Sequence, residues 1–319
     1  MSFGKINLLA LVLAASFFGL ADQSLAQSEP TSWKFAVGDQ FKVSLNQTSS
    51  ANTKVESRKT LIENATNLQM SWDVLKVAED IATIEQSILG ISLDVNNPAI
   101  PNQAIAFDTS ASEEEAKEYS KSSKALLKQV KPLIGLKFNV MMASTGEIKE
   151  VTLPPASAQV VNELPDTVRL RQLFSPEGLT AILGASAIVF PEKTIEAGAS
   201  WTEEKPVTTP LGKFTRKRTY TVGGKKAVDG QDLTEIRMEP TLVPEQASEE
   251  SGSVESSLDP KLISFSGSGM LLVDVEGGYL KSSSFENELK SQRPYREKTI
   301  ETTVKNQIRM TINKTAEEK

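Results

Sequence analysis

The sequence predicts an α+β fold that is mostly antiparallel β-sheet, with two similar strand-rich halves and a few helices packed on sheet faces. Three observations support this. Phe41, Val43 and Leu45 alternate with polar residues, which is typical of a half-buried strand. Gly38 and Gly198 each stand three residues before an aromatic residue that opens a strand run. Capped helical segments are few and lie between the strand runs.

Residues 1–26 have the features of a signal peptide. One Lys precedes the apolar run "INLLALVLAASFFGLA", and small residues at Ser24 and Ala26 predict cleavage between Ala26 and Gln27. A membrane anchor is the alternative, but it needs about 20 apolar residues, and this run is shorter and ends at Asp22. No later segment is apolar enough to span a bilayer, so we expect no transmembrane anchor after cleavage. The absence of Cys favours export to a bacterial periplasm or exterior.

The first β-rich half is expected over residues 27–152. Leu68 to Val95 reads as two long strands around a turn at Ala78-Glu79-Asp80. A helix is predicted over 112–131, because Ser112 and Glu115 form a capping box and Pro132 ends the apolar stripe.

A helical connection is predicted over residues 153–190, and the second β-rich half is predicted over 191–319. Asp229-Gly230 favours a tight hairpin turn there. An acidic, Ser-rich loop is expected over 244–260. The stretches "FNVMMASTGEI" and "MLLVDVEGGYL" share the spacing from first residue to Gly, and the elements follow the same order in both halves, which indicates an internal duplication. Hairpins that recur for physical reasons alone are the alternative.

Several chemistries are excluded by composition. Without His or Cys, the chain cannot form His-based triads, thiol nucleophiles or the usual zinc sites. No complete nucleophile or phosphate-binding motif is present in residues 27–319, so we expect no catalytic residue, metal or cofactor. A net charge of −6 gives no reason to expect nucleic acid as a partner.

Two groups of residues are candidate binding sites. Leu126 and Leu127 belong to the apolar stripe of the helix over 112–131, which needs a sheet face and could cover an apolar ligand. The second group is a basic cluster that could dock an anionic surface, or instead guard an exposed strand edge against pairing. It consists of Lys213, Arg216, Lys217, Arg218, Lys225 and Lys226. Trp33, Trp72 and Trp201 fit core anchors better than sugar-stacking platforms.

The Gly-aromatic opener, the strand around Trp72-Asp73-Val74 and the stretch "FPEKTIEAGASW" resemble an uncharacterised exported protein family common in planctomycete-type bacteria. The resemblance covers most of the chain after the signal peptide and implies a compartment but no activity. In architecture alone, the chain also resembles periplasmic lipoprotein-carrier half-barrels, in which a curved antiparallel sheet wraps around helices.

Two functions remain open. The first is a non-catalytic exported binding or structural protein, whose partner is an apolar ligand or a cell-envelope component. The alternative is a carboxylate-dependent hydrolase acting on polysaccharide, for which Asp73, Asp94 and Asp274 in strand-like segments are the candidates. An open apolar groove favours the first, and two convergent carboxylates favour the second.

Overall fold

The computed structural model describes residues 31–97, 104–164, 170–186, 188–191, 195–209, 211–244, 261–296 and 298–315. The predicted signal peptide and its cleavage site between Ala26 and Gln27 lie outside the described residues. So does the acidic loop, apart from Pro244 at its start.

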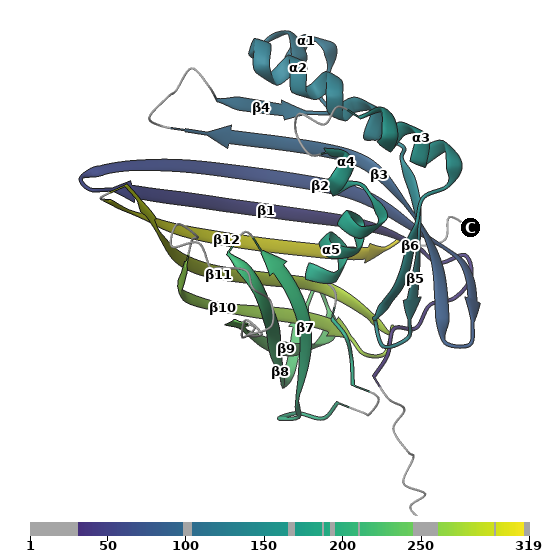
Figure 1. Ribbon diagram of the computed structural model, residues 1–319. Coiled ribbons are helices and arrows are strands. Elements are labelled where there is room, and N and C mark those ends of the chain that lie inside the picture. Colours follow the sequence, from purple (N-terminus) through teal and green to yellow (C-terminus); the bar gives the residue numbers. More distant parts are fainter. Residues whose placement is uncertain are drawn as a thin grey trace, which may run out of the picture.

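One continuous antiparallel sheet contains all the described strands (Figure 1). Its order is β6-β5-β3-β2-β1-β12-β11-β10-β9-β8-β7, with β4 paired to β3 beside this path. The strands are β1 (Gln40–Val55), β2 (Arg58–Ala78), β3 (Ile81–Asn96), β4 (Ile105–Asp108), β5 (Lys137–Ala143), β6 (Ile148–Thr152), β7 (Ser200–Thr209), β8 (Gly212–Val228), β9 (Gln231–Pro244), β10 (Lys261–Asp274), β11 (Tyr279–Tyr295) and β12 (Lys298–Lys314). The predicted class, mostly antiparallel sheet with a few helices, is confirmed.

The helices are short. They are α1 (Glu113–Lys117), α2 (Lys121–Val130), the 3₁₀ turn η2 (Lys131–Leu133), α3 (Pro155–Glu163), α4 (Leu170–Leu173) and α5 (Pro176–Ser186). Within the described part of the chain, no helix combines the length and apolar character that a membrane span requires.

Strands from the first part of the chain lie on one side of the β1–β12 contact, and strands from the second part lie on the other. Reading across the sheet, β6-β5-β3-β2-β1 is followed, beyond β12, by β11-β10-β9-β8-β7. The openings of β1 and β7 share their hydrogen bonds: the Gly38 N–H donates to Val74 O and the Gly198 N–H donates to Val222 O, each at 2.9 Å. In β2 and β8 a register shift begins directly after the accepting residue. The spacing of Gly and aromatic residues therefore corresponds to one recurring local structure.

The helix expected over 112–131 is interrupted. Ser112 and Glu115 form the predicted capping box at α1, but a second cap at Ser120 starts α2, and its hydroxyl accepts from the Ser123 N–H at 3.1 Å. The break has a local cause, because Ser side chains compete for backbone hydrogen bonds and favour caps over helix interiors.

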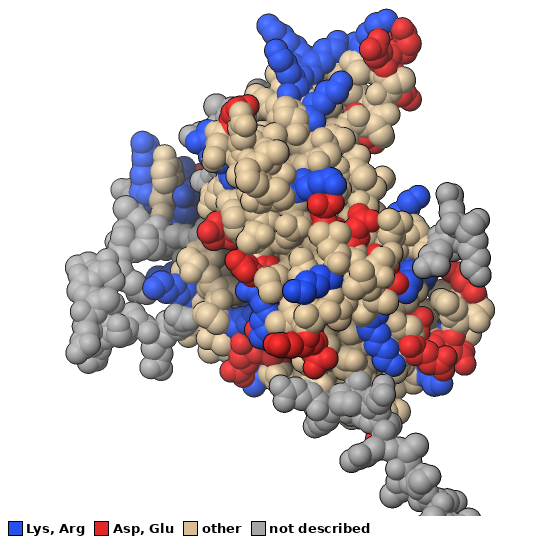
Figure 2. Space-filling view, turned by 90° about the vertical axis from the view of Figure 1, so that its right-hand side faces the viewer, with Lys and Arg blue, Asp and Glu red and all other residues tan. Residues whose placement is uncertain are grey.

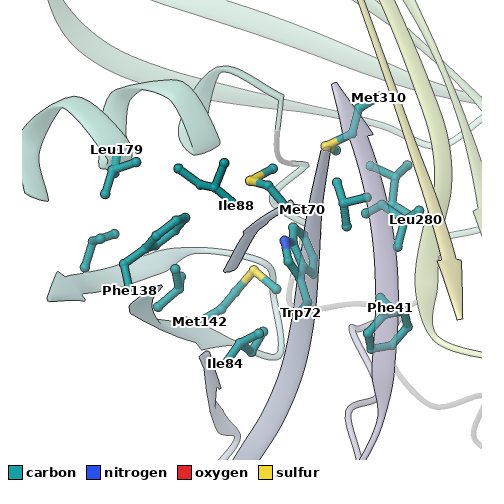
Figure 3. Close-up of a cluster of buried hydrophobic side chains, with 14 of the residues drawn as sticks. Phe41, Met70, Trp72, Ile84, Ile88, Phe138, Met142, Leu179, Leu280 and Met310 are labelled. Carbon is teal, nitrogen blue, oxygen red and sulfur yellow. The ribbon is translucent and has the colours of Figure 1, made fainter. Parts of the chain in front are cut away.

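The core lies on one face of the sheet, which we call the inner face. Phe41, Trp72, Phe138 and Leu280 come from four strands, and Leu179 of α5 packs toward them (Figure 3). All five side chains are buried. The helices α3 to α5 therefore supply the second layer that the apolar half of the sheet requires.

The helices cover only one end of the long strands. In Figure 1, α4 and α5 lie in front of the sheet near the end where β1 begins, while the β1–β2 and β11–β12 hairpins extend beyond them. The hairpin of β7 and β8 curls in front of β10 to β12 (Figure 1). Over the face shown in Figure 2, charges of both signs are interspersed. The helices α1 and α2 also carry lysines, and α1 carries acids. The inner face beyond the helices is the part of the sheet that has no helical cover.

Candidate functional site

A cavity of about 440 Å³ lies on the inner face beyond the helices. We call it the inner groove. Strands β1, β11 and β12 form its floor, and Thr209 and Leu211 at the β7–β8 turn close over it. Its lining consists of Thr53, Thr209, Leu211, Leu289, Ser291, Arg293, Ile300, Thr302, Val304 and Asn306. Its volume falls within the range of small-molecule sites.

The strand register arranges the floor in successive transverse rows. Because paired residues share a face, each row can be read from the pairing of β2, β1, β12 and β11. Moving from the tips of the hairpins toward the core, the rows are Arg58, Val55, Ile300 and Arg293; Thr60, Thr53, Thr302 and Ser291; Ile62, Ala51, Val304 and Leu289; and Asn64, Ser49, Asn306 and Asn287. An apolar row thus lies between a hydroxyl row and an amide row, with two arginines at the outer rim.

The polar rows are partly self-satisfied. The Asn306 amide donates to Asn287 Oδ1 at 3.1 Å, and the hydroxyls of Thr53 and Thr302 lie 3.4 Å apart. Cross-strand pairs of this kind stabilise the sheet and reduce the cost of lining a cavity with polar groups. The side chains of the apolar row cannot form such hydrogen bonds, and part of their hydrocarbon surface stays in water. Ile62 is 41% exposed, and Val304 and Leu289 are half-buried. The apolar row therefore presents surface that a ligand could bury.

A second cavity, of about 390 Å³, lies between α5, β6 and the inner face of β7 and β8. We call it the cationic cavity. Lys205, Arg216 and Glu203 line it, together with Thr180, Ala181 and Gly184 of α5. The Glu203 carboxylate is buried against Arg218 Nη1 at 3.8 Å and Lys205 Nζ at 2.9 Å, and it accepts from the Tyr220 hydroxyl at 3.1 Å. Arg218 also donates to Gly184 O, which connects β8 to α5.

Burial changes the pKa of two side chains at or beside this cavity, Tyr220 and Arg216. Desolvation raises the pKa of Tyr220 to about 12, so its hydroxyl stays a donor at neutral pH. Desolvation and the neighbouring Arg218 lower the pKa of Arg216 from its usual value. The cavity therefore concentrates positive charge in a partly dry environment.

The sequence-predicted apolar candidates lie elsewhere. Leu126 and Leu127 on α2 are half-buried against the core, where α2 packs on β4. They do not line the inner groove. The α2–β4 contact is fixed by the buried Ser123 hydroxyl, which accepts from the Ala106 N–H at 3.0 Å.

The six residues of the predicted basic cluster do not share one surface. Arg216 and Arg218 point to the inner face, because they alternate in β8 with the buried Phe214, Tyr220 and Val222. Lys217 lies on the opposite face and pairs with Glu204 at 3.1 Å. Lys213 is exposed at the start of β8, and Lys225 and Lys226 are exposed near its end. Of the six, Arg216 lines the cationic cavity, and Arg218 is buried two residues away on the same face.

The carboxylate candidates are dispersed. Asp73 accepts from the Gln40 amide at 2.9 Å, and Asp274 caps its own turn by accepting from the Gly277 N–H at 2.7 Å. Asp94 lines a hollow of about 920 Å³ that also includes Glu63 and Glu288.

A lysine, Lys305, also lines the hollow at Asp94. Hydrogen bonds from Lys290 and Lys305 lower the pKa of Glu288, whereas a glycosidase acid needs a raised pKa. Among the described carboxyl groups, each pKa that departs from its usual value is lowered.

The tryptophans contribute to packing. Trp33 and Trp72 are buried, and Trp33 stacks on Phe35. Trp201 is half-buried, stacks on Tyr220 and donates from its indole N–H to Val189 O at 2.9 Å. Aromatic anchors of this kind hold the loops before β1 and β7 onto the sheet.

Sequence reasoning missed both cavities. The inner groove depends on strands distant in the chain, β1 with β11 and β12, and no local pattern marks it. The cationic cavity had a signal: in "KFTRKRTYTV", Arg216 and Arg218 alternate in phase with Phe214 and Tyr220. That phase predicts arginines on the buried face.

Comparison with known proteins gives a family. Residues 79–251, more than half of the chain, match a family of unknown function, DUF6263. No curated protein matches the chain.

Three solved structures show distant similarity. A lipovitellin structure, titled for its lipid–protein interactions, aligns with 90% of this chain at 12% identity and a TM-score of 0.45, and the chain spans about a quarter (26%) of that protein. An outer membrane channel from Pseudomonas putida F1 aligns with 88% of this chain and 97% of its own at 8% identity and a TM-score of 0.23. A DUF1329 family protein from Desulfovibrio piger aligns with 89% of this chain and 88% of its own at 9% identity and a TM-score of 0.13. The family assignment therefore rests on the sequence match.

Proposed function

The chain belongs to DUF6263, a family of unknown function, and we propose that it is a non-catalytic, exported protein that binds an apolar ligand in the inner groove. Export is supported by the features of residues 1–26. The single observation that carries the binding proposal is the apolar row of Ile62, Ala51, Val304 and Leu289, which no described helix covers and of which Val304 and Leu289 line the inner groove.

The energetic argument is burial. An apolar chain laid on this row removes hydrocarbon from water on both partners, and each buried methylene contributes about 0.8 kcal/mol. The helices bury the corresponding side chains at the other end of the strands, so the protein already uses this face for apolar contacts there. A ligand would take the place of that helical layer at the open end.

Binding can be tested with a fluorescent apolar probe that is titrated into the folded protein. We expect saturable binding, and we expect Leu289→Gln to weaken it about tenfold, because the introduced amide must be desolvated in the groove. Leu75→Gln is the matched control: it makes the same change at a leucine that is 51% exposed and does not line the groove.

Two results would overturn the proposal. The first is a folded wild-type protein that binds no probe, or a Leu289→Gln protein that binds as well as Leu75→Gln. The second is cleavage of a polysaccharide that is lost on replacing one Asp or Glu, which would establish the hydrolase instead.

A further inference from the structure

The cationic cavity places two like charges directly opposite each other. Lys205 of β7 and Arg216 of β8 are register partners, and both line the cavity. Like charges opposite each other in a β-ladder destabilise it, and at a half-buried position water screens the repulsion poorly. A third cation, Arg218, is 4% exposed and lies two residues from Arg216 on the same face.

The cavity's own acid does not balance these charges. Among the described residues that line the cavity, Glu203 is the only acidic one, and Lys205, Arg218 and Tyr220 already surround it. In the described part of the chain, no hydrogen bond or ion pair involves the Arg216 guanidinium, although Glu203 acts on it at longer range. Among the described lining residues, two cations, Lys205 and Arg216, thus face one carboxylate, and the Arg216 guanidinium lines the open volume.

Residues of one strand, β7, line both cavities. Residues of β7 up to Thr208 line the cationic cavity, while Thr209 and, past the turn, Leu211 line the inner groove. Strand residues advance by about 3.3 Å each, so the Lys205–Arg216 pair lies only a few residues from the apolar lining. A molecule with a charged head and an apolar tail would therefore meet both environments along β7.

We propose that the cationic cavity binds the oxyanion head, carboxylate or phosphate, of a single-chain amphiphile whose tail lies in the inner groove. The inference rests on the proposed apolar-ligand function and names the class of ligand. A guanidinium suits this role because its N–H groups form charge-assisted, bidentate hydrogen bonds with oxyanions. Bound oxyanion would also relieve the repulsion between Lys205 and Arg216.

The test compares laurate, dodecyl phosphate and the uncharged dodecanol as competitors of the fluorescent probe, at constant ionic strength because exposed lysines also attract anions. The variants are Arg216→Gln and, as the matched control, Arg237→Gln, which alters an exposed arginine of β9 that lines neither cavity. We expect the wild type to bind one or both anionic competitors about tenfold more tightly than dodecanol. Arg216→Gln should abolish that preference and leave dodecanol affinity unchanged, and Arg237→Gln should keep the preference.

The other outcomes separate the two proposals. If Arg216→Gln keeps the preference for anionic competitors, or if the wild type shows no such preference, the proposed head site is wrong. The apolar-ligand function would still be supported if dodecanol binds and Leu289→Gln weakens its binding. If no twelve-carbon competitor binds, both proposals fail. In that case, thermal unfolding with added inorganic phosphate identifies the source of the anion. If phosphate stabilises the wild type but not Arg216→Gln, the cavity is a site for a free oxyanion and the amphiphile is rejected.

Discussion

At the scale of single residues, Gly146 is the most constrained glycine of the turns. Its φ of +92° is in the left-handed region, and its N–H donates to Ala143 O at 2.7 Å to close the turn after β5. A Cβ at this position would meet the backbone oxygen of Ile188 and lie 2.5 Å from Trp33 Nε1. Both conformation and space therefore require glycine.

We predict that Gly146→Ala lowers the free energy of unfolding by about 2–4 kcal/mol, because backbone strain and steric overlap add. Gly38→Ala is the matched control, since Gly38 has a φ of +91° but no atom within 4 Å of the place that a Cβ would occupy. That control should lose only about 1 kcal/mol from backbone strain. Urea denaturation of both variants measures the difference, and equal losses would show that the packing at Gly146 does not matter.

The residue scale also shows what alternation can and cannot reveal. Arg216 and Arg218 alternate in phase with Phe214, Tyr220 and Val222, and this phase predicts that both arginines lie on the inner face. Grouping all six basic residues as one patch overlooks that successive strand residues point to opposite faces of the sheet. The partners of these arginines were not predictable. Glu203 and Gly184 approach them only through the β7–β8 register and the docking of α5.

At the scale of elements, α2 is held to the sheet by polar as well as apolar contacts. Tyr119, just before α2, accepts from the Asp108 N–H through its hydroxyl at 3.0 Å, and the buried Ser123 accepts from the Ala106 N–H. Both bonds satisfy the free edge of β4, which pairs with β3 on its other side. A sheet edge covered by side-chain acceptors is protected from pairing with other chains.

We predict that Ser123→Ala loosens β4 while the rest of the sheet stays protected. Removing the hydroxyl leaves the Ala106 N–H without its acceptor, at a cost of about 1–3 kcal/mol. Amide hydrogen exchange over residues 104–110 should become roughly tenfold faster or more. Ser122→Ala, an exposed neighbour in the same helix, is the control and should leave this exchange unchanged. Unchanged protection in Ser123→Ala would mean that apolar packing alone fixes α2.

Hairpins were the predictable elements, and the helix was predictable in part. The turn at Ala78-Glu79-Asp80 and the turn at Asp229-Gly230 both form, with Glu79, Asp80, Asp229 and Gly230 at positive φ. Local turn chemistry is sufficient for these. The capping box at Ser112 is also a local pattern, and it was predictable. The break at Ser120 arises because two N-caps compete within one stretch. The hydrogen bond between Ser123 of α2 and β4 joins two separate elements, and no local sequence pattern predicts it.

At the scale of the whole molecule, β1 and β12 join the two halves into one sheet. Phe41 to Val55 pair with β12 on one side of β1, and the same residues pair with β2 on the other. The repeated spacings indicated similar halves but not how they meet, because that contact joins segments over 200 residues apart in the chain. The inner groove could not be predicted for the same reason, since its floor lies where β1 pairs with β12, which we call the seam.

The last prediction concerns the cooperativity that this seam implies. Ile84 of β3 and Ile236 of β9 are both fully buried, one in each half, and both belong to the same hydrophobic core. Because the ladder and the core are continuous across β1 and β12, neither half can lose its structure without exposing apolar surface of the other. We expect Ile84→Val and Ile236→Val each to destabilise the protein by about 1 kcal/mol. Each change should also reduce the protection of the slowest-exchanging amides equally in β3 and in β9, as measured by native-state hydrogen exchange in low urea. If each substitution instead weakens only its own half, the halves are separate folding units, and the inner groove lies on an interface between domains that can open.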